Sequence, residues 1–169
     1  NDEIYTFINN ISSLTHRHEI SILGCFIYIM YVLSILNGKD KIESYAYIRN
    51  IKYSLFSKDS KKVYERILNN DLSKLDINDI LSSGYIVHSL EAALWSILTT
   101  NSYEEAIIKS INLGNDTDTI GAITGSIAGI IYGYDSIPKE WLDKMQRLDY
   151  LEDYCDKFEK VLIKDGVKK

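Results

Sequence analysis

The sequence predicts an all-α protein, and three features of its 169 residues support this fold class. Apolar residues recur at steps of three and four along most of the chain, which is the period of one helical face. The strict alternation of apolar and polar residues that is typical of strands is scarce. Proline, which interrupts helices, occurs once, at position 138. We therefore expect a bundle of helices.

In the first half of the chain, the apolar pattern predicts four helices followed by an irregular connection over residues 71–83. The uncharged run 20–36 forms the second helix and ends before Asn37-Gly38, a pair that commonly stops a helix. The other three are marked by Ile4, Phe7, Ile8 and Ile11, then by Ile42, Tyr45, Ile48, Ile51 and Leu55, and then by Val63, Ile67 and Leu68.

The second half predicts helices over residues 88–99 and from Ser102 to about Leu113. Ser102 and Glu105 have the spacing of a capping box, in which each side chain binds a free backbone amide. A further helix begins near Thr117. It carries glycines at 121, 125, 129 and 133, a spacing that lets another helix approach closely. Pro138 suits a helix start, and residues 149–164 form the last helix.

The apolar run 20–36 (ISILGCFIYIMYVLSIL) has two interpretations, a buried core helix or a membrane span. It falls just short of the ~18 apolar residues expected of a span. It contains Ser21, Gly24 and Ser34, and charged residues flank it on both sides. We expect a core helix, and therefore no membrane contact.

Composition fits an ordinary globular protein, with 46% hydrophobic and 25% charged residues. The net charge is −5 and no stripe of basic residues stands out, so we expect no nucleic-acid partner. Cys25 and Cys155 are isolated, which suggests neither a disulfide framework nor a zinc site. A cytoplasmic protein is the corresponding expectation.

The segment 114–121 (GNDTDTIG) carries the clearest sign of chemistry, because two carboxylates and several hydroxyls meet at a loop-to-helix junction. Helix capping is one interpretation, since Asp and Thr oxygens accept bonds from free amides at helix starts. Capping explains one acidic residue well. Two acids two residues apart repel each other unless a cation or hydrogen-bond donors neutralise them.

A calcium loop and a phosphatase motif fit this segment poorly. An EF-hand needs a bidentate glutamate at its twelfth position, where Ile127 stands. The phosphatase pattern Asp-x-Asp-x-Thr/Val has Ile120 at its fifth position and expects a preceding strand. Magnesium prefers hard oxygen ligands, and Asp116, Asp118 and Thr119 offer such oxygens from one turn. By spacing alone, an elaborate cap and a magnesium site both stay open.

Three segments resemble the ADP-ribosylglycohydrolase family. The run NLGNDTDTIGA at 112–122, with the glycines that follow it, is similar to the family's C-terminal signature, although Asn115 stands where the usual Gly-Gly-Asp-Thr-Asp-Thr has its second glycine. The run GYIVHSLEAALW at 84–95 is similar to the helix before that signature. The run LTHRHE at 14–19 is similar to the family's Thr-His motif, so the resemblance covers about residues 12–133.

The resemblance implies a compact orthogonal helical bundle that hydrolyses the glycosidic bond between ADP-ribose and a protein side chain or a small leaving group. It implies two Mg²⁺ ions, for which Mn²⁺ can substitute. Asp116, Asp118 and Thr119 match the family's metal ligands. His16 matches the histidine that contacts the ribose or phosphate region of the substrate; without the resemblance it would be read as a surface histidine. ADP-ribose or an ADP-ribosylated protein is the implied partner.

The resemblance also implies parts that do not occur before His16. These are a Thr-Asp-Asp-Thr block with further metal ligands and, upstream of it, the catalytic acid. We therefore expect residues 1–169 to be a single domain that forms the C-terminal part of an ADP-ribosylglycohydrolase domain and is incomplete for catalysis alone. A second chain carrying the N-terminal half is one source of the rest. The alternatives are a catalytically inactive relative that binds ADP-ribose and a structural or immunity-type interaction protein.

Overall fold

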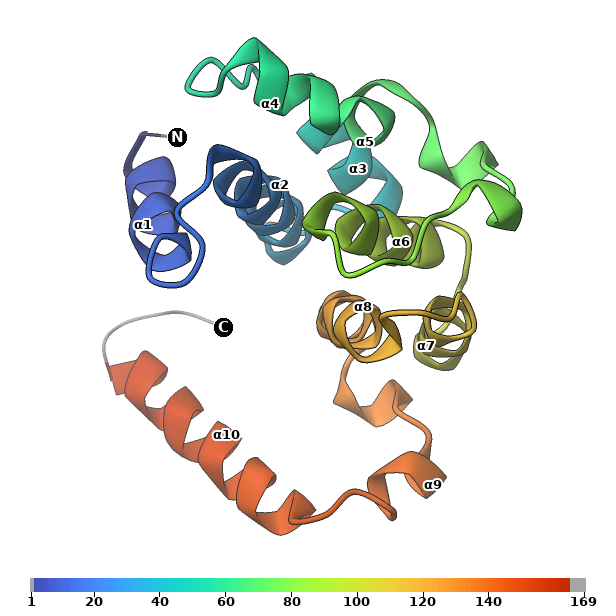
Figure 1. Ribbon diagram of the computed structural model, residues 1–169. Helices are drawn as coiled ribbons and strands as arrows, with labels where there is room; N and C mark the ends of the chain where they lie inside the picture. The colour runs from blue at the N-terminus through green and yellow to red at the C-terminus, as the bar shows by residue number, and fades with distance from the viewer. Residues whose placement is uncertain (1, 165–169) are drawn as a thin grey trace. The chain divides into compact units, whose positions relative to one another are not determined.

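The computed structural model describes residues 2–164, which form ten α-helices and three short 3₁₀ helices and contain no strand (Figure 1). The all-α prediction is confirmed. The chain divides into two compact units, one ending at Ser136 and the other beginning at Ile137. The first unit contains α1 (Asp2–Ser12), α2 (Glu19–Leu36), α3 (Lys41–Asn50), α4 (Lys58–Val63), α5 (Glu65–Asn69), η1 (Leu72–Lys74), η2 (Ile77–Asp79), α6 (Ile86–Leu98), α7 (Tyr103–Ile111), α8 (Thr117–Tyr132) and η3 (Tyr134–Ser136).

Helix α2 lies in the core of the first unit, as the sequence predicts. It contacts α1, α3, α4, α6 and α8, and it buries Leu23, Ile27 and Tyr31 completely. Among residues 2–164 it is the one helix long and apolar enough to cross a membrane, and 44% of it is buried inside this protein. Its contacts are those of a core helix, while the absence of a membrane partner stays a prediction.

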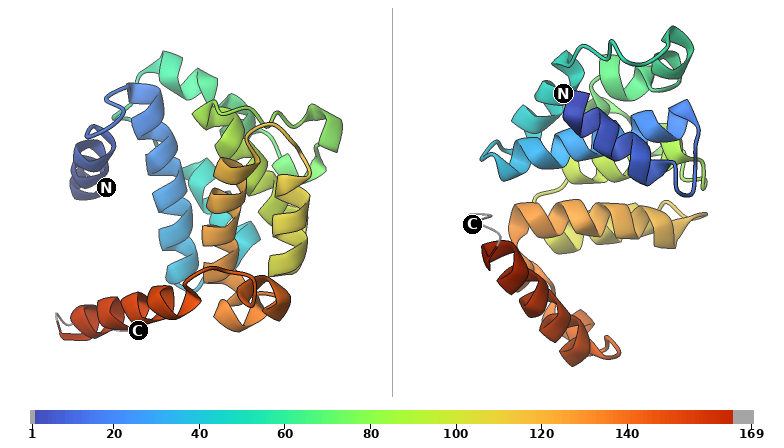
Figure 2. Two further views of the ribbon diagram at one scale, coloured as in Figure 1. Left: turned by 60° about the horizontal axis from the view of Figure 1, so that its bottom comes forward. Right: turned by 90° about the vertical axis from the view of Figure 1, so that its left-hand side faces the viewer.

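Helices α2, α6 and α8 run side by side in the same direction (Figure 2). The space beside Gly24, near the start of α2, is filled by the Tyr64 hydroxyl and by Ile86 at the start of α6. Further along, the Tyr28 hydroxyl and the Ser126 hydroxyl of α8 lie 2.9 Å apart. After α2 ends, the Lys41 ammonium donates hydrogen bonds beyond the end of α6 and to the last residue of α8. The three N-termini therefore lie at one end of the unit.

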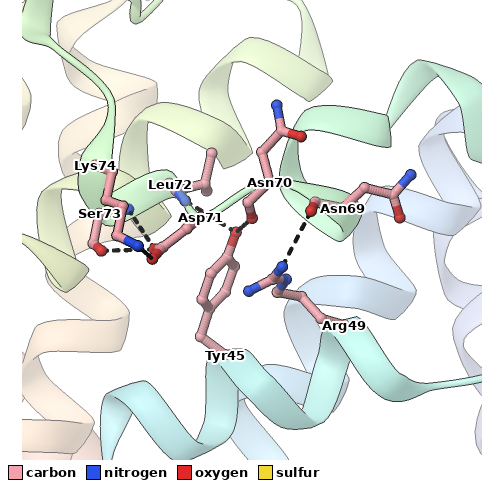
Figure 3. A network of polar contacts seen from close by, with 8 residues as sticks. All are labelled: Tyr45, Arg49, Asn69, Asn70, Asp71, Leu72, Ser73 and Lys74. Atoms are coloured by element: carbon pink, nitrogen blue, oxygen red, sulfur yellow. Dashed lines mark hydrogen bonds and ion pairs between the residues drawn. The ribbon is translucent and has the colours of Figure 1, made fainter.

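The connection from α5 to η1 is held against α3 by polar contacts (Figure 3). The buried Tyr45 hydroxyl donates to the carbonyl oxygens of Ile67 and Asn70, at 2.8 and 2.9 Å. The Arg49 guanidinium donates to the carbonyl oxygen of Asn69 at 3.1 Å. These bonds satisfy carbonyl groups that α5 leaves without helical partners at its C-terminus. They fix the start of the long connection that leads to α6.

The predicted third and fourth helices differ most from the structure, whereas the helix predicted over residues 88–99 is α6 (Ile86–Leu98) and the helix predicted to end at about Leu113 ends at Ile111. Helix α3 ends at Asn50, so Leu55 lies outside it and is 46% exposed. The predicted fourth helix is two short helices that meet at Tyr64, whose buried side chain donates to the carbonyl oxygen of Ile20 at 2.8 Å. The break places this tyrosine against α2, a tertiary contact that helical periodicity does not reveal.

The predicted capping box at the start of α7 is present in altered form. Ser102 Oγ accepts a hydrogen bond from the Glu105 amide at 3.1 Å, as the pattern requires. The Glu105 carboxylate accepts from the amide of Asn101, at 2.9 Å, and so satisfies the residue before the cap. The helix start is thus predicted correctly, but Glu105 binds the amide of Asn101 and not, as a capping box requires, that of Ser102.

The second unit contains α9 (Lys139–Leu142) and α10 (Leu148–Lys164). Pro138 is the residue immediately before α9, close to its predicted place at a helix start. Helix α10 begins one residue before the predicted position and leaves several large apolar side chains exposed, which are Tyr150, Leu151, Tyr154, Phe158, Val161 and Ile163. The prediction of a single domain over residues 1–169 stays a prediction.

Candidate functional site

The three segments singled out in the sequence lie at the same end of the first unit, where α2, α6 and α8 begin. His16 lies in the loop before α2, residues 82–85 precede α6, and the turn of residues 113–116 precedes α8. The α6 and α8 segments are in direct contact, because the Asp116 amide donates to the carbonyl oxygen of Ser82 at 3.1 Å. Helix N-termini present free backbone amides and a partial positive charge, so this end favours anionic ligands.

The turn before α8 has a special backbone conformation. Gly114 has φ of 78° and Asn115 has φ of 55°, so two successive residues adopt the left-handed region. Glycine occupies this region without penalty, and asparagine is among the non-glycine residues that tolerate it best. The two residues reverse the chain after α7 and bring Asp116 to the start of α8.

Asp116 occupies the N-cap position of α8, but its side chain makes no capping hydrogen bond. Its Oδ1 atom instead accepts a hydrogen bond from the Thr119 hydroxyl at 2.9 Å. Asp118 lies in the first turn of the helix and is exposed. The structure therefore does not support the capping interpretation for Asp116, and its carboxylate remains directed at the neighbouring hydroxyl.

The oxygens of this turn have the chemistry that Mg²⁺ prefers, namely carboxylates and a hydroxyl. Asp116 and Thr119 are brought together, and Asp118 is two residues from the first and one from the second. Among residues 2–164, no group of three or more His, Cys, Asp or Glu side chains is arranged to hold a metal ion. The turn thus fits part of a magnesium shell, whose remaining positions need water, substrate or other protein oxygens.

The segment before α6 forms the wall beside the Asp116 carboxylate. A Cβ atom at Gly84 would lie 3.0 Å from Asp116 Oδ2, so a larger residue there would press on this oxygen. Ser83 Oγ lies 2.8 Å from His88 Nδ1, and the Tyr85 ring packs edge-on against the His88 ring with centroids 5.2 Å apart. Tyr85 is 43% exposed, so its ring lies at the surface beside this segment.

His16, the predicted substrate-binding residue, is exposed. Its amide donates to the carbonyl oxygen of Ser12 at 2.8 Å, and its own carbonyl oxygen accepts from the His18 amide at 2.9 Å. These bonds shape the loop between α1 and α2. His16 shares the end of the unit with Asp116 and Thr119, and its contact with substrate stays a prediction.

Glu19 anchors the helix that follows this loop, a role the sequence analysis missed. Its carboxylate accepts hydrogen bonds from the Ser57 amide at 2.9 Å and from the Ser57 hydroxyl at 2.6 Å, and also from the Ser60 hydroxyl. The bonds from Ser57 and then Ser60 lower the pKa of Glu19 to about 2. One carboxylate therefore joins the N-termini of α2 and α4 next to the His16 loop.

Glu91 is a second carboxylate that the sequence analysis did not single out. It is 3% exposed on α6 and forms a two-pronged ion pair with Arg66, with both N–O distances at 3.0 Å. Burial raises the pKa of Glu91, although Arg66 opposes the effect. Its position as the one acidic residue of the apolar stretch 86–98 could have marked Glu91 in the sequence as a buried charge that needs a partner. Its pairing with Arg66 makes it a structural charge.

A separate groove of about 710 Å³ lies between α1 and the helices α2, α6 and α8. Its wall is mainly apolar and includes Phe7, Tyr28 and Ile86. None of the predicted metal ligands lines it, so this volume and the candidate site are different parts of the unit.

Comparison with known proteins gives consistent matches. The sequence is 34% identical over 136 residues to ADP-ribosylarginine hydrolase Tri1 of Pseudomonas putida, a match that covers 79% of this chain and 34% of the relative. It is 43% identical over 79 residues to the protein of the same name from Serratia proteamaculans, covering 47% of this chain and 22% of the relative.

A third relative carries a different name. The chain is 41% identical over 64 residues to ADP-ribosyl-[dinitrogen reductase] glycohydrolase of Rhodospirillum rubrum, covering 38% of this chain and 22% of the relative. The chain thus spans only between 22% and 34% of the length of these three relatives. Residues 1–167 match the family described as ADP-ribosylglycohydrolase. The chain belongs to the ADP-ribosylglycohydrolase family.

Proposed function

We propose that this protein takes part in hydrolysing the bond between ADP-ribose and a protein side chain, with its active centre at the N-termini of α2, α6 and α8. The observation that carries the proposal is the Asp116 carboxylate. It stands at a helix start, is not used as a cap, and lies with Thr119 in one turn. The names of the relatives support this reaction class, since each describes removal of ADP-ribose.

The proposed cofactor is Mg²⁺, held by Asp116, Asp118 and Thr119. A bound cation of this kind can orient ribose hydroxyls and activate a water nucleophile. The protein residues contribute hard oxygens from one rigid helix start, and His16 is proposed to contact the ribose or phosphate part of the substrate. The positive ends of three helices favour the pyrophosphate at the same place.

Arginine is the proposed attachment residue of the ADP-ribose. This assignment is supported by two relatives that are both named ADP-ribosylarginine hydrolase, one of which matches 79% of this chain. The alternative of a catalytically inactive relative gains no support from these names. A cytoplasmic location remains part of the proposal.

We further propose that other protein oxygens complete the site. One turn offers two carboxylates and one hydroxyl, and no third acidic side chain joins them within residues 2–164. A two-metal centre needs both ions held about 3.5–4 Å apart. The remaining ligands and the catalytic acid would come from the family's early Thr-Asp-Asp-Thr part, on this polypeptide or on a second chain.

A release assay tests the proposal. A protein ADP-ribosylated on arginine is incubated with the 169-residue chain, alone and together with a polypeptide that carries the Thr-Asp-Asp-Thr part. We expect release in the mixture with Mg²⁺, and loss of release with a chelator or with Asp116→Ala. Release in the mixture without any divalent cation would contradict the metal role. Full turnover by the chain alone would contradict the need for further ligands, and no release in any arm would contradict the reaction.

A further inference from the structure

We infer that Ser82 is a positioning residue for the turn that carries the proposed metal ligands, and that Asn115 acts on this turn through Ser82. The inference rests on the proposed function, because it concerns what holds Asp116, Asp118 and Thr119 in place. Neither Ser82 nor Asn115 is itself proposed to touch metal or substrate.

Ser82 holds the turn at three points. It is 5% exposed and lies in the connection before α6. Its carbonyl oxygen accepts from the Asp116 amide at 3.1 Å. Its hydroxyl donates to the carbonyl oxygen of Leu113 at 3.1 Å and lies 2.9 Å from Asn115 Nδ2, from which it accepts. One buried serine thus binds the first, third and fourth residues of the segment 113–116.

Asn115 is the residue in this segment whose conformation needs support. Its φ of 55° lies in the left-handed region, which non-glycine residues adopt at a cost unless a local bond favours it. The bond from its side-chain amide to Ser82 supplies such support. A glycine would adopt the same φ freely, but it could not form the bond. The side chain therefore links the backbone before Asp116 to the α6 segment.

The expected consequence is a fixed position for the proposed ligands. Mg²⁺ requires nearly ideal octahedral geometry with short metal–oxygen distances, so small shifts of a ligand turn weaken binding. Residues that orient metal ligands typically change metal affinity by about 10–100-fold when they are replaced. Removing the Ser82 hydroxyl leaves the ligands unchanged and removes two of the three bonds that hold the turn, so that only the bond from the Asp116 amide to the Ser82 carbonyl oxygen remains.

The test compares four variants by calorimetric titration with Mn²⁺. Ser82→Ala is expected to weaken binding about tenfold, and Asn115→Gly, which removes the side-chain bond without straining the backbone, is expected to weaken it as well. Ser82→Thr, which keeps a hydroxyl, is expected to restore affinity. Ser83→Ala is the matched control, because its neighbouring hydroxyl contacts His88 and not the turn. Equal affinities for Ser82→Ala and Ser83→Ala would overturn the inference.

A double-mutant cycle decides whether Asn115 acts through Ser82. If it does, Ser82→Ala combined with Asn115→Gly weakens Mn²⁺ binding no more than Ser82→Ala alone. If the losses of Mn²⁺ affinity in the two single variants instead multiply in the double variant, Asn115 acts independently of Ser82. Melting temperatures are measured for all variants. A variant that binds Mn²⁺ weakly but melts at the wild-type temperature has lost the order of the turn and not the fold.

A second readout needs no metal. Hydrogen exchange of the Asp116 amide, measured without cations, is expected to be about tenfold faster in Ser82→Ala than in the wild type, whereas core amides of α2 keep their rates. Unchanged exchange at Asp116 would overturn the inference. Faster exchange in Ser82→Ala together with no Mn²⁺ binding by the wild type would support the role of Ser82 in holding the turn and contradict the proposed metal site. Failure of the inference and failure of the proposed function can therefore be told apart.

Discussion

At the scale of single residues, surroundings separate the structural acidic side chains from the candidate ligands. Glu19 is bound by two serines, and Glu91 is paired with Arg66. Asp118 is exposed, and Asp116 is bound by the Thr119 hydroxyl that is itself a proposed ligand. Carboxylates already saturated by protein donors serve the fold, and those facing solvent at a helix start are available to a cation.

Glu19 predicts an acid-dependent contribution to stability. Its pKa in the folded protein is lowered to about 2 by the bonds from Ser57 and Ser60. A lowered pKa means that the contribution is complete above the unfolded-state pKa and is lost as pH falls toward 2. Glu19→Gln should therefore destabilise the protein by about 1 kcal/mol at pH 7, the usual size of one hydrogen-bond contribution.

Urea unfolding at several pH values checks this prediction. The free energy of unfolding should differ less between the wild type and Glu19→Gln as pH falls below about 4. Glu3→Gln is the matched control, because Glu3 is an exposed acid in the first turn of α1. A difference that stays constant down to pH 2 would mean that the charge of Glu19 does not matter.

The ion pair between the buried Glu91 and the partly exposed Arg66 predicts a larger effect on stability. Arg66→Met leaves the Glu91 carboxylate buried without its partner, and because the Arg66 side chain is 46% exposed to water, the cost should be about 1–3 kcal/mol, less than for a fully buried pair. The same loss should raise the pKa of Glu91 further, so the variant is most destabilised at high pH. Combining Arg66→Met with Glu91→Leu should recover much of the stability in thermal unfolding. If the double variant is no more stable than the single one, the pair is not the cause.

At the scale of elements, α7 and α8 form an antiparallel pair whose contact is made by glycines. A Cβ atom at Gly121 would lie 3.1 Å from Ile111, and one at Gly125 would lie 3.4 Å from Ile107. A Cβ atom at Gly129 would have no atom of another element within 4 Å. The glycine spacing therefore predicted the close crossing correctly at Gly125 and wrongly at Gly129, because α7 begins at Tyr103, which already lies beside Gly125.

This difference supplies a matched pair of variants. Gly125→Leu should overpack the contact with α7 and cost about 1–3 kcal/mol. Gly129→Leu has space for its side chain and gains helix propensity of up to about 1 kcal/mol, so it should be neutral or stabilising. Thermal unfolding should therefore give a lower melting temperature for Gly125→Leu than for Gly129→Leu. Equal melting temperatures would show that the α7–α8 contact tolerates a large side chain.

At the scale of the whole molecule, periodicity predicted most of the α-helices, but it predicted neither the three 3₁₀ helices nor the division of the fourth helix into α4 and α5. The predicted helices 20–36 and 149–164 agree with α2 and α10 within one residue, because a long apolar or amphipathic pattern fits only a helix. The break at Tyr64 and the early end of α3 depend on tertiary contacts. Such contacts join residues far apart in the sequence and leave no local signal.

The candidate site shows the same division. The oxygen-rich turn at Asp116–Thr119 could be predicted from the sequence, since several oxygen donors within four residues are a local pattern. The hydrogen bonds of Ser82 to Asn115 and to Leu113 could not, because 33 and 31 residues separate the partners. Nor did any pattern show that Asp116 stands at a helix start without capping it. The convergence of three helix N-termini became visible only in the folded chain.

The central claim is that the start of α8 holds a divalent cation, and calorimetric titration of Mn²⁺ into the 169-residue chain tests it most directly. The account predicts that Asp118→Ala weakens binding at least tenfold. Asp59→Ala is the matched control, because Asp59 is an exposed aspartate in the first turn of α4, at the same position relative to its helix start. Affinity unchanged by Asp118→Ala, or reduced equally by both substitutions, would contradict the claim.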